Sequence, residues 1–246
     1  MLAALIGVGS VYGFATSRGS AATGNPSQQV LAGKALFLQG CSSCHGIAAE
    51  GGTDAPSLIG VGAAAVDFQV STGRMPLRQE GAQADRKPAR FTSEQIAQLA
   101  AYVASLGPGP AVPGKEQYTP SGANMGLGGN LFRTNCSSCH NFVGAGGALA
   151  DGKYAPSLAN ATDKQIYEAM LTGPGTMPVF SDKQLTQSEK QDIIAYVQGL
   201  KAEPDPGGAN LGRSGAVAEG LVAFLAGIVA LGGVAMWIGA RAKRAA

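Results

Sequence analysis

A five-residue run, Cys-Ser-Ser-Cys-His, occurs twice in this chain of 246 residues. The first copy is Cys41–His45 and the second is Cys136–His140, so their first cysteines lie 95 residues apart (136 − 41). All four cysteines and both histidines of the chain lie inside these two runs. Any chemistry that requires a thiol or an imidazole from this chain must therefore take place at one of them.

The spacing within each run is that of covalent haem c attachment. Two thiols three positions apart can each form a thioether with a haem vinyl group. The histidine that follows is then placed under the porphyrin, where a ring nitrogen binds the iron. We expect two covalently bound haem c groups, with these thioether cysteines and histidine ligands: Cys41, Cys44 and His45, and Cys136, Cys139 and His140.

Paired cysteines can also build other sites. Two Cys-x-x-Cys pairs can form a four-cysteine zinc site, although such pairs usually lie close together in the sequence. They can also form disulfides or thioredoxin-like redox motifs, but the redox motif requires a βαβ setting that this sequence does not predict. None of these sites explains the histidine that directly follows each pair, so haem attachment is the better interpretation.

Methionine is the natural sixth ligand of each iron, because the chain has no third histidine and a thioether stabilises ferrous iron. Met75 and Met177 occupy equivalent places, each directly before a proline. Met170 falls in a predicted helix over 162–171, where a core methionine is the simpler interpretation. Met125 lies in a predicted linker. We therefore expect Met75 and Met177 to be the sixth ligands.

A proline follows each run, in the four-residue segment Ala-Pro-Ser-Leu that occurs at 55–58 and again at 155–158. Pro56 and Pro156 both fit a simple turn. We also expect each proline carbonyl to accept a hydrogen bond from the imidazole nitrogen that does not bind iron, because such a contact orients a ligating histidine.

Apolar periodicity predicts a short helix over 30–39, with Leu31, Ala35 and Leu38 on one face. It also predicts amphipathic helices that close each half, over 93–106 and 188–200. Their candidate N-caps are Thr92 or Ser93, and Thr186 or Ser188. The matching landmarks, offset by between 94 and 102 residues, indicate an internal repeat with changes of loop length.

This repeat and the composition between its copies divide the chain into segments. The chain has 37 glycines and only 6% aromatic residues, so each half has few large side chains for a core, and covalent haem would supply a large apolar body. We expect a transmembrane helix over 1–17, a first haem domain over 27–107, a Pro/Gly linker over 108–128, a second haem domain over 129–201, a linker over 202–215, a transmembrane helix over 216–240 and a basic tail over 241–246. A Gly-Ala-Asn-x-Gly run occurs at 122–126 and at 208–212 without an evident physical role.

Both ends of the chain have apolar segments. Residues 221–240 are uncharged, long enough to cross a bilayer, and followed by Arg241, Lys243 and Arg244. The positive-inside rule therefore predicts a cytoplasmic C-terminus and haem domains on the extracytoplasmic side of the cell membrane. Residues 1–17 fit either a retained anchor or a cleaved export signal, and lack the basic start of a signal. We favour an anchor whose upstream basic residues are missing, which gives two membrane helices.

The charge distribution excludes one class of partner. The formal net charge is +2, and residues 27–107 carry six acidic and six basic side chains. Nucleic-acid-binding domains need a basic patch, which neither half of this chain has. We expect membrane lipid and proteins, but not nucleic acid, as partners.

Each half resembles a class I cytochrome c domain, with Cys-x-x-Cys-His near its start, then a proline, a Met-Pro segment and a closing helix with an aromatic residue. Two such domains beside a C-terminal transmembrane helix resemble the dihaem cytochrome c subunit of the actinobacterial-type cytochrome bcc complex, a quinol–cytochrome c reductase. The resemblance implies an all-α fold. It also implies an electron carrier between the cytochrome b and Rieske iron–sulfur subunits and cytochrome c oxidase, within one respiratory supercomplex. The enzyme is then the quinol–cytochrome c reductase, a proton-translocating oxidoreductase complex of which this chain is a subunit.

Two other functions fit parts of this pattern. The chain also resembles dihaem electron-carrier subunits of other membrane oxidoreductases, such as a cbb-type oxidase, although the C-terminal anchor argues against that type. A dihaem peroxidase-like enzyme is a further alternative. In such an enzyme one haem must lose its sixth ligand, whereas methionines placed alike in both halves favour two six-coordinate irons and no catalytic residue in this chain.

Overall fold

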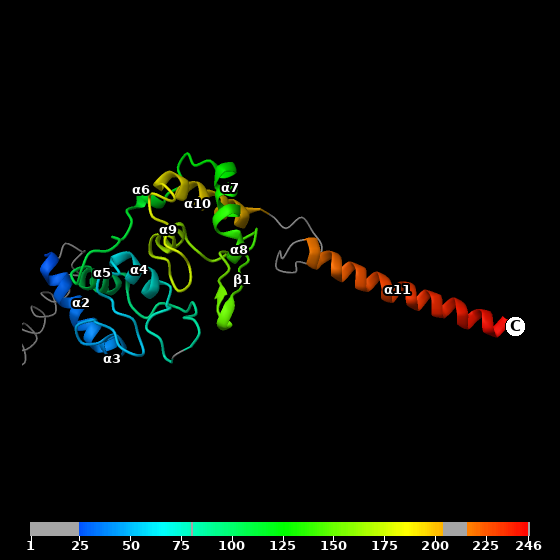
Figure 1. The fold of residues 1–246 in the computed structure, drawn as a ribbon, viewed down its shortest axis with the longest axis horizontal. Coiled ribbons are helices and arrows are strands. Elements are labelled where there is room, and N and C mark those ends of the chain that lie inside the picture. Colours follow the sequence, from blue (N-terminus) through cyan, green and yellow to red (C-terminus); the bar gives the residue numbers. More distant parts are fainter. Residues whose placement is uncertain (1–24, 80, 204–215, 246) are drawn as a thin grey trace, which may run out of the picture. The chain divides into compact units, whose positions relative to one another are not determined.

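The computed structural model describes residues 25–79, 81–203 and 216–245. These residues form helices and a single short β-hairpin (Figure 1), in agreement with the all-α fold that the sequence predicts. The predicted helix over 1–17 lies outside the described residues, as does almost all of the predicted linker over 202–215.

Contacts within the chain define two units. The first unit runs as far as Val112 and also includes the segment Leu171–Pro178. The second unit contains Pro113–Met170 and continues from Val179. Each unit holds one of the two Cys-Ser-Ser-Cys-His runs.

Helices α2 and α5 form the core of the first unit, and their close crossing depends on a glycine. A Cβ added to Gly33 of α2 would lie 1.9 Å from the backbone carbonyl oxygen of Gln98 in α5, so only glycine fits there. One turn further along α2, the ring of Phe37 is 1% exposed and packs 5.2 Å from the ring of Tyr102. The described helices of this unit are α2 (Pro26–Gly40), α3 (Ser42–His45), α4 (Ala63–Ser71) and α5 (Ser93–Ala104).

The face of α2 that the apolar periodicity singled out is not the packed face. Leu31 is 66% exposed and Leu38 is 42% exposed, and Ala35 is exposed as well. The buried residues of α2 are Gly33 and Phe37. The physical reason is that a close helix crossing selects the smallest residue, which a count of large apolar side chains does not register.

The second unit repeats this arrangement with α7 and α10. A Cβ on Gly128 of α7 would lie 1.9 Å from the carbonyl oxygen of Asp192 in α10. The Phe132 ring packs 5.3 Å from the Tyr196 ring at the 49° tilt also found for the ring pair of the first unit. The elements of the second unit before its apolar C-terminal helix are α6 (Lys115–Tyr118), α7 (Met125–Asn135), α8 (Ser137–His140), β1 (Gly147–Ala148), the 3-10 helix η1 (Ala150–Gly152), β2 (Tyr154–Ala155), α9 (Asp163–Thr172) and α10 (Gln187–Ala202).

We expect Gly128→Ala to lower the free energy of unfolding of the second unit by about 3 kcal/mol, because the added methyl meets backbone that cannot move independently. Gly126→Ala is the matched control on the same helix. A Cβ there comes no closer than 3.4 Å to the Asn124 side chain, and alanine favours a helix by about 1 kcal/mol over glycine. Denaturant unfolding of the two variants checks this, and equal stabilities would contradict the role of Gly128.

The structure gives the first Gly-Ala-Asn-x-Gly run a role. Asn124 is the N-cap of α7, and its side-chain oxygen accepts a hydrogen bond from the Leu127 amide at 3.0 Å. Helix α7 therefore begins at Met125, inside the predicted linker over 108–128. The capping boxes at Thr92 and Thr186 match the first of the two N-cap candidates for each closing helix.

Two parts of the rest of the predicted linker are packed, one in each unit. The Pro110 carbonyl accepts a hydrogen bond from the Ala64 amide at 3.0 Å within the first unit. In the second unit the Gln191 amide group donates to the carbonyl oxygens of Glu116 and Gln117, at 2.8 and 3.1 Å. These backbone contacts were not predicted from the Pro/Gly composition, which indicated a semi-extended connection.

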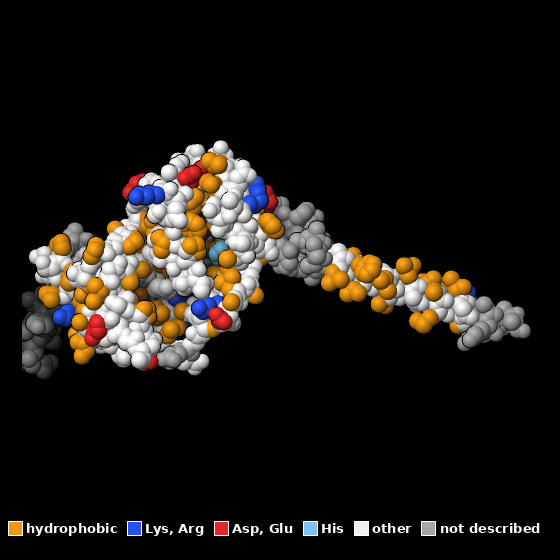
Figure 2. All heavy atoms as spheres, in the orientation of Figure 1, with side chains coloured by type: hydrophobic (Ala, Val, Ile, Leu, Met, Phe, Trp, Pro, Cys, Tyr) orange, Lys and Arg blue, Asp and Glu red, His pale blue; other side chains and the backbone are white. Residues whose placement is uncertain are grey.

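Helix α11 (Ala216–Ala245) is the one described helix long and apolar enough to cross a membrane, over Gly220–Arg241. Hydrophobic side chains cover it (Figure 2), and none of its apolar span is buried against other described residues. The Arg241 guanidinium lies 4.3 Å from the centre of the Trp237 ring. The helix thus extends the predicted span of 216–240 by five residues, into the basic tail.

Candidate functional site

The first thiol of each run follows directly on a helix of its unit. The Cys41 amide donates to the Phe37 carbonyl oxygen, and the Cys136 amide donates to the Phe132 carbonyl oxygen, both at 2.8 Å. A four-residue helix, α3 or α8, then carries the chain to the histidine. The aromatic ring buried at each helix crossing therefore lies one turn before the first cysteine and fixes where each run begins.

All four cysteines are free thiols. Burial raises the pKa of Cys41, and burial raises that of Cys136 to about 11, with a smaller contribution from the second cysteine of each pair. A thiol with a raised pKa stays protonated at neutral pH, unlike the low-pKa thiolate of a redox motif. In the part of the chain that the structure describes, no three His, Cys, Asp or Glu side chains are grouped to hold a metal ion.

Both histidine rings contact the backbone carbonyl of a proline. His45 Nδ1 lies 2.8 Å from the Pro56 oxygen, and His140 Nδ1 lies 3.0 Å from the Pro156 oxygen. A carbonyl only accepts, so Nδ1 carries the proton and Nε2 is left with its lone pair. Burial lowers the pKa of His140, against the opposing effect of the Pro156 hydrogen bond. This ring is therefore a neutral imidazole, the form that binds a metal.

A glycine makes each of these contacts possible. Gly51 and Gly146 have positive φ angles, 84° and 87°, and each amide donates to the carbonyl oxygen of the histidine, at 2.7 and 2.9 Å. A Cβ on Gly51 would lie 2.4 Å from the Ser57 amide nitrogen and 2.7 Å from the Pro56 carbonyl carbon. Sequence reasoning missed this pair, although the same spacing of six residues after each histidine was available as a signal.

We expect Gly51→Ala to destabilise the first unit by about 2 kcal/mol, since alanine is strained at this φ and its methyl meets the backbone that carries Pro56. The matched control is Gly52→Ala, where an added Cβ comes no closer than 3.8 Å to other atoms. Denaturant unfolding measures both variants. A Gly52→Ala effect as large as that of Gly51→Ala would contradict this explanation.

Met75 lies at the core of the first unit. It is half-buried, and like Cys41 it packs against the buried cluster that contains Phe37 and Tyr102. Its amide donates to the Gln69 carbonyl oxygen at 3.0 Å, which ties it to the end of α4. The structure thus places the predicted methionine ligand and Cys41, a predicted thioether cysteine, against one core.

The predicted methionine of the second half is placed differently. Met177 is half-buried, and its amide donates to the Pro174 carbonyl oxygen at 3.2 Å. Its segment, Leu171–Pro178, belongs to the first unit, whereas His140 lies in the second. The structure therefore does not bring Met177 and His140 together within one unit.

The other two methionines have structural positions. Met170 is 2% exposed, as expected of a core residue in α9. Met125 lies in α7, not in a linker, and its sulfur would be 2.9 Å from a Cβ placed on Gly199 of α10. Its side chain therefore lies against the end of α10.

A β-hairpin accounts for one change of loop length between the halves. Gly51 and Pro56 are five residues apart, whereas Gly146 and Pro156 are ten apart. The β1–η1–β2 hairpin, in which Gly147 pairs with Ala155 and Ala148 with Tyr154, accommodates the five additional residues. The offset between the repeats thus rises from 95 to 100 beside the second run.

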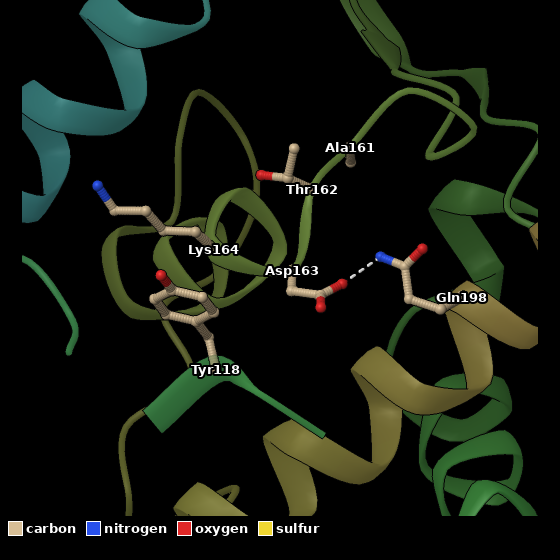
Figure 3. Close-up of a pocket in the computed structure, with 6 residues that line it drawn as sticks. All are labelled: Tyr118, Ala161, Thr162, Asp163, Lys164 and Gln198. Atoms are coloured by element: carbon tan, nitrogen blue, oxygen red, sulfur yellow. Dashed lines mark hydrogen bonds between the residues drawn. The ribbon is translucent and has the colours of Figure 1, made fainter. Parts of the chain in front are cut away.

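One open cleft of the second unit is separate from these residues. Two of its polar side chains bind each other, since Gln198 donates to the Asp163 carboxylate, and the Thr162 hydroxyl accepts from the backbone amide of Gln165 at the start of α9. The cleft has a volume of about 540 Å³ (Figure 3) and is lined by Tyr118, Ala161, Thr162, Asp163, Lys164 and Gln198. None of these residues is a predicted thioether or iron ligand.

The residues at both runs fit haem c. Each run presents two free thiols and a histidine whose Nδ1 is held by a proline carbonyl, which leaves Nε2 for iron. Two units with this donor set define a dihaem c-type cytochrome.

Comparison with known proteins agrees with this class. Residues 30–107 match the family model described as cytochrome c, and residues 123–197 match the one described as cytochrome C oxidase, cbb3-type, subunit III. The chain is therefore made of two cytochrome c domains, which implies covalently bound haem c.

Relatives identify the family. The chain is 47% identical to the cytochrome bc1 complex cytochrome c subunit of Corynebacterium efficiens, over 96% of this chain and 86% of the relative. It is 49% identical to the subunit of the same name from Mycobacterium tuberculosis, over 98% and 89%. A more distant relative is a cbb3-type cytochrome c oxidase subunit CcoP from Azospirillum, 29% identical over 68% and 61%. The chain belongs to the family of cytochrome bc1 complex cytochrome c subunits.

Proposed function

We propose that this chain is a membrane-anchored electron carrier with two covalently bound haem c groups. It carries electrons from the cytochrome b and Rieske iron–sulfur part of a quinol–cytochrome c reductase to cytochrome c oxidase. The observation that carries the proposal is the paired histidine geometry, with Nδ1 held at 2.8 and 3.0 Å from a proline carbonyl in two domains of one chain.

Each residue of the proposed sites has a distinct task. Haem c supplies one-electron redox chemistry at its iron when it is bound. Cys41 and Cys44 tether it covalently in the first domain, as Cys136 and Cys139 do in the second. The proline carbonyls keep each histidine in the tautomer that offers Nε2 and prevent rotation of the ring.

Methionine completes each proposed site. Met75 and Met177 would each bind iron as a second protein ligand, and their thioethers would favour the ferrous state and a high potential. Two iron ligands from the chain would leave no position for a small-molecule substrate. This arrangement suits electron transfer between proteins, and the oxidoreductase activity belongs to the whole complex.

The membrane arrangement follows from α11 and the residues after it. We propose that α11 spans the cell membrane with its C-terminus in the cytoplasm, on the basis of Arg241, Lys243 and Arg244. Both haem domains then lie on the extracytoplasmic side, and residues 1–17 form a second membrane helix. Tethering to the membrane lipid raises the effective concentration of both haems at fixed partners.

Mild detergent extraction of a tagged chain from its native membranes tests this function. The expected product contains two haem c per chain, together with haem b, a Rieske protein and haem a. A chain that carries haem c but copurifies with neither haem b nor a Rieske protein would refute the complex-level part of the proposal. A chain without covalent haem would refute all of it.

One observation favours a second candidate function. The second domain matches a subunit of cbb3-type oxidase, so the chain fits a dihaem carrier in another membrane oxidoreductase. The same purification separates the two functions. Copurification with a b-type oxidase and no Rieske protein would favour the second.

A further inference from the structure

The backbone directly after His140 is strained. Asn141 has φ 66° and ψ 161°, a region that is essentially restricted to glycine. The first domain has a glycine at the same place, Gly46, with nearly the same angles of 82° and 159°. The second domain therefore makes the same turn with a side chain that disfavours it.

Local hydrogen bonds close the turn that Asn141 begins. The Asn141 amide donates to the Ser137 carbonyl oxygen at 2.9 Å, and the Gly144 amide donates to the Asn141 carbonyl oxygen at 3.2 Å. The Asn141 side-chain oxygen accepts from the Val143 amide at a longer 3.4 Å. The far end of the turn is fixed to the rest of the domain by the Leu158 amide, which donates to the Gly144 carbonyl oxygen at 2.8 Å, but none of these bonds fixes Phe142, in the middle of the turn, to α10.

Tyr196 of α10 supplies such a fixation. Its hydroxyl donates to the Phe142 carbonyl oxygen at 3.2 Å, next to the strained residue. Its ring packs on Phe132, which is 1% exposed and lies four residues before Cys136. One side chain therefore holds the chain on both sides of the second run.

The first domain shares the ring pair but not the hydrogen bond. Tyr102 packs on Phe37 with the same tilt, yet the structure shows no hydrogen bond from its hydroxyl to Ile47, the counterpart of Phe142, both of which lie among the described residues. The Tyr196 ring also lies close to α7, since a Cβ added to Gly129 would lie 3.1 Å from it.

We propose that Tyr196 is a positioning residue of the second iron site. Its hydroxyl holds the turn that starts at Asn141, and through that turn it keeps His140 directed at the iron. The first domain does not need this contact, because Gly46 adopts its conformation without strain. The inference rests on the proposed function, since it assumes that His140 is an iron ligand.

The test uses the full chain with its haems, in detergent. The haem c content per chain is measured first. Tyr196→Phe keeps the ring pair and removes only the hydroxyl. We expect amide hydrogen exchange over 141–146 to become about fivefold faster, as for the loss of one hydrogen bond. We also expect one of the two reduction potentials to shift. Tyr102→Phe is the matched control, and we expect it to change neither quantity.

A second variant separates positioning from packing. In an Asn141→Gly background the strain is gone, so Tyr196→Phe should alter exchange and potential much less than it does in the native chain. If the chain carries two haems and the Tyr196→Phe protein matches the native one in amide exchange and in both reduction potentials, the inference is overturned and the proposed function stands. Equal effects of Tyr196→Phe in both backgrounds would also overturn it. Fewer than two haems in the native chain would overturn the proposed function itself.

Discussion

A chain with Cys136 and Cys139 both replaced by alanine is expected to carry one covalent haem c in place of two. The same loss is expected from replacing Cys41 and Cys44, and replacing all four cysteines should leave none. The reason is that in the proposed sites each pair supplies both thioether bonds of one haem, and the two pairs lie in separate units. The haem c content per chain, measured from the absorbance of the denatured protein, checks all three variants.

The serines inside each run provide the control. Ser137 and Ser138 lie between Cys136 and Cys139, and Ser137→Ala with Ser138→Ala should retain two haems, because neither hydroxyl is a proposed ligand. A cysteine-pair variant that kept both haems would contradict thioether attachment at that run. Loss of both haems from one pair variant would contradict the independence of the two sites.

Replacing Met177 by histidine is expected to lower one of the two reduction potentials by on the order of 100 mV or more. An imidazole stabilises the ferrous state less well than a thioether, and axial ligands set haem potentials over about 0.8 V. Met75→His should lower the other potential by a similar amount. A redox titration of the purified chain, followed in the visible spectrum, measures both.

Met125→Leu is the control for both methionines, since Met125 is 50% exposed and packs against α10. It should leave both potentials unchanged. The proposal of a methionine ligand is tested more strictly at the second site, because Met177 and His140 lie in different units of the structure. If Met125→Leu lowered a potential and Met177→His did not, the proposed ligand of the second iron would be wrong.

The parts of the fold that a specific residue pattern marks could be predicted from the sequence. The two runs and the shared Ala-Pro-Ser-Leu segments led to the two domains. Their proline carbonyls lie within hydrogen-bonding distance of the histidines, as the proposed role requires. Thr92 and Thr186 were readable as caps, since a threonine followed three residues later by Gln or Glu is a local signal.

The parts of the fold in which two helix backbones approach closely could not be predicted from the sequence. Gly33 and Gly128 matter through the absence of a side chain, and in a chain with 37 glycines such positions do not stand out by type. The start of α7 was missed because its first residues, Met125 to Gly129, include three glycines, which disfavour a helix. Packing of α7 against α10 and the Asn124 cap outweigh that preference.

The β1–η1–β2 hairpin shows where this architecture tolerates change. The bond from Leu158 to Gly144 on either side of it has the same role as that from Leu58 to Ala49 in the shorter loop, at 2.8 and 2.9 Å. Because both ends are pinned in the same way, extra residues bulge outward without disturbing the histidine. Asp151, exposed at the tip of the hairpin, is a natural point for grafting an epitope or an optical reporter near the second Cys-Ser-Ser-Cys-His run.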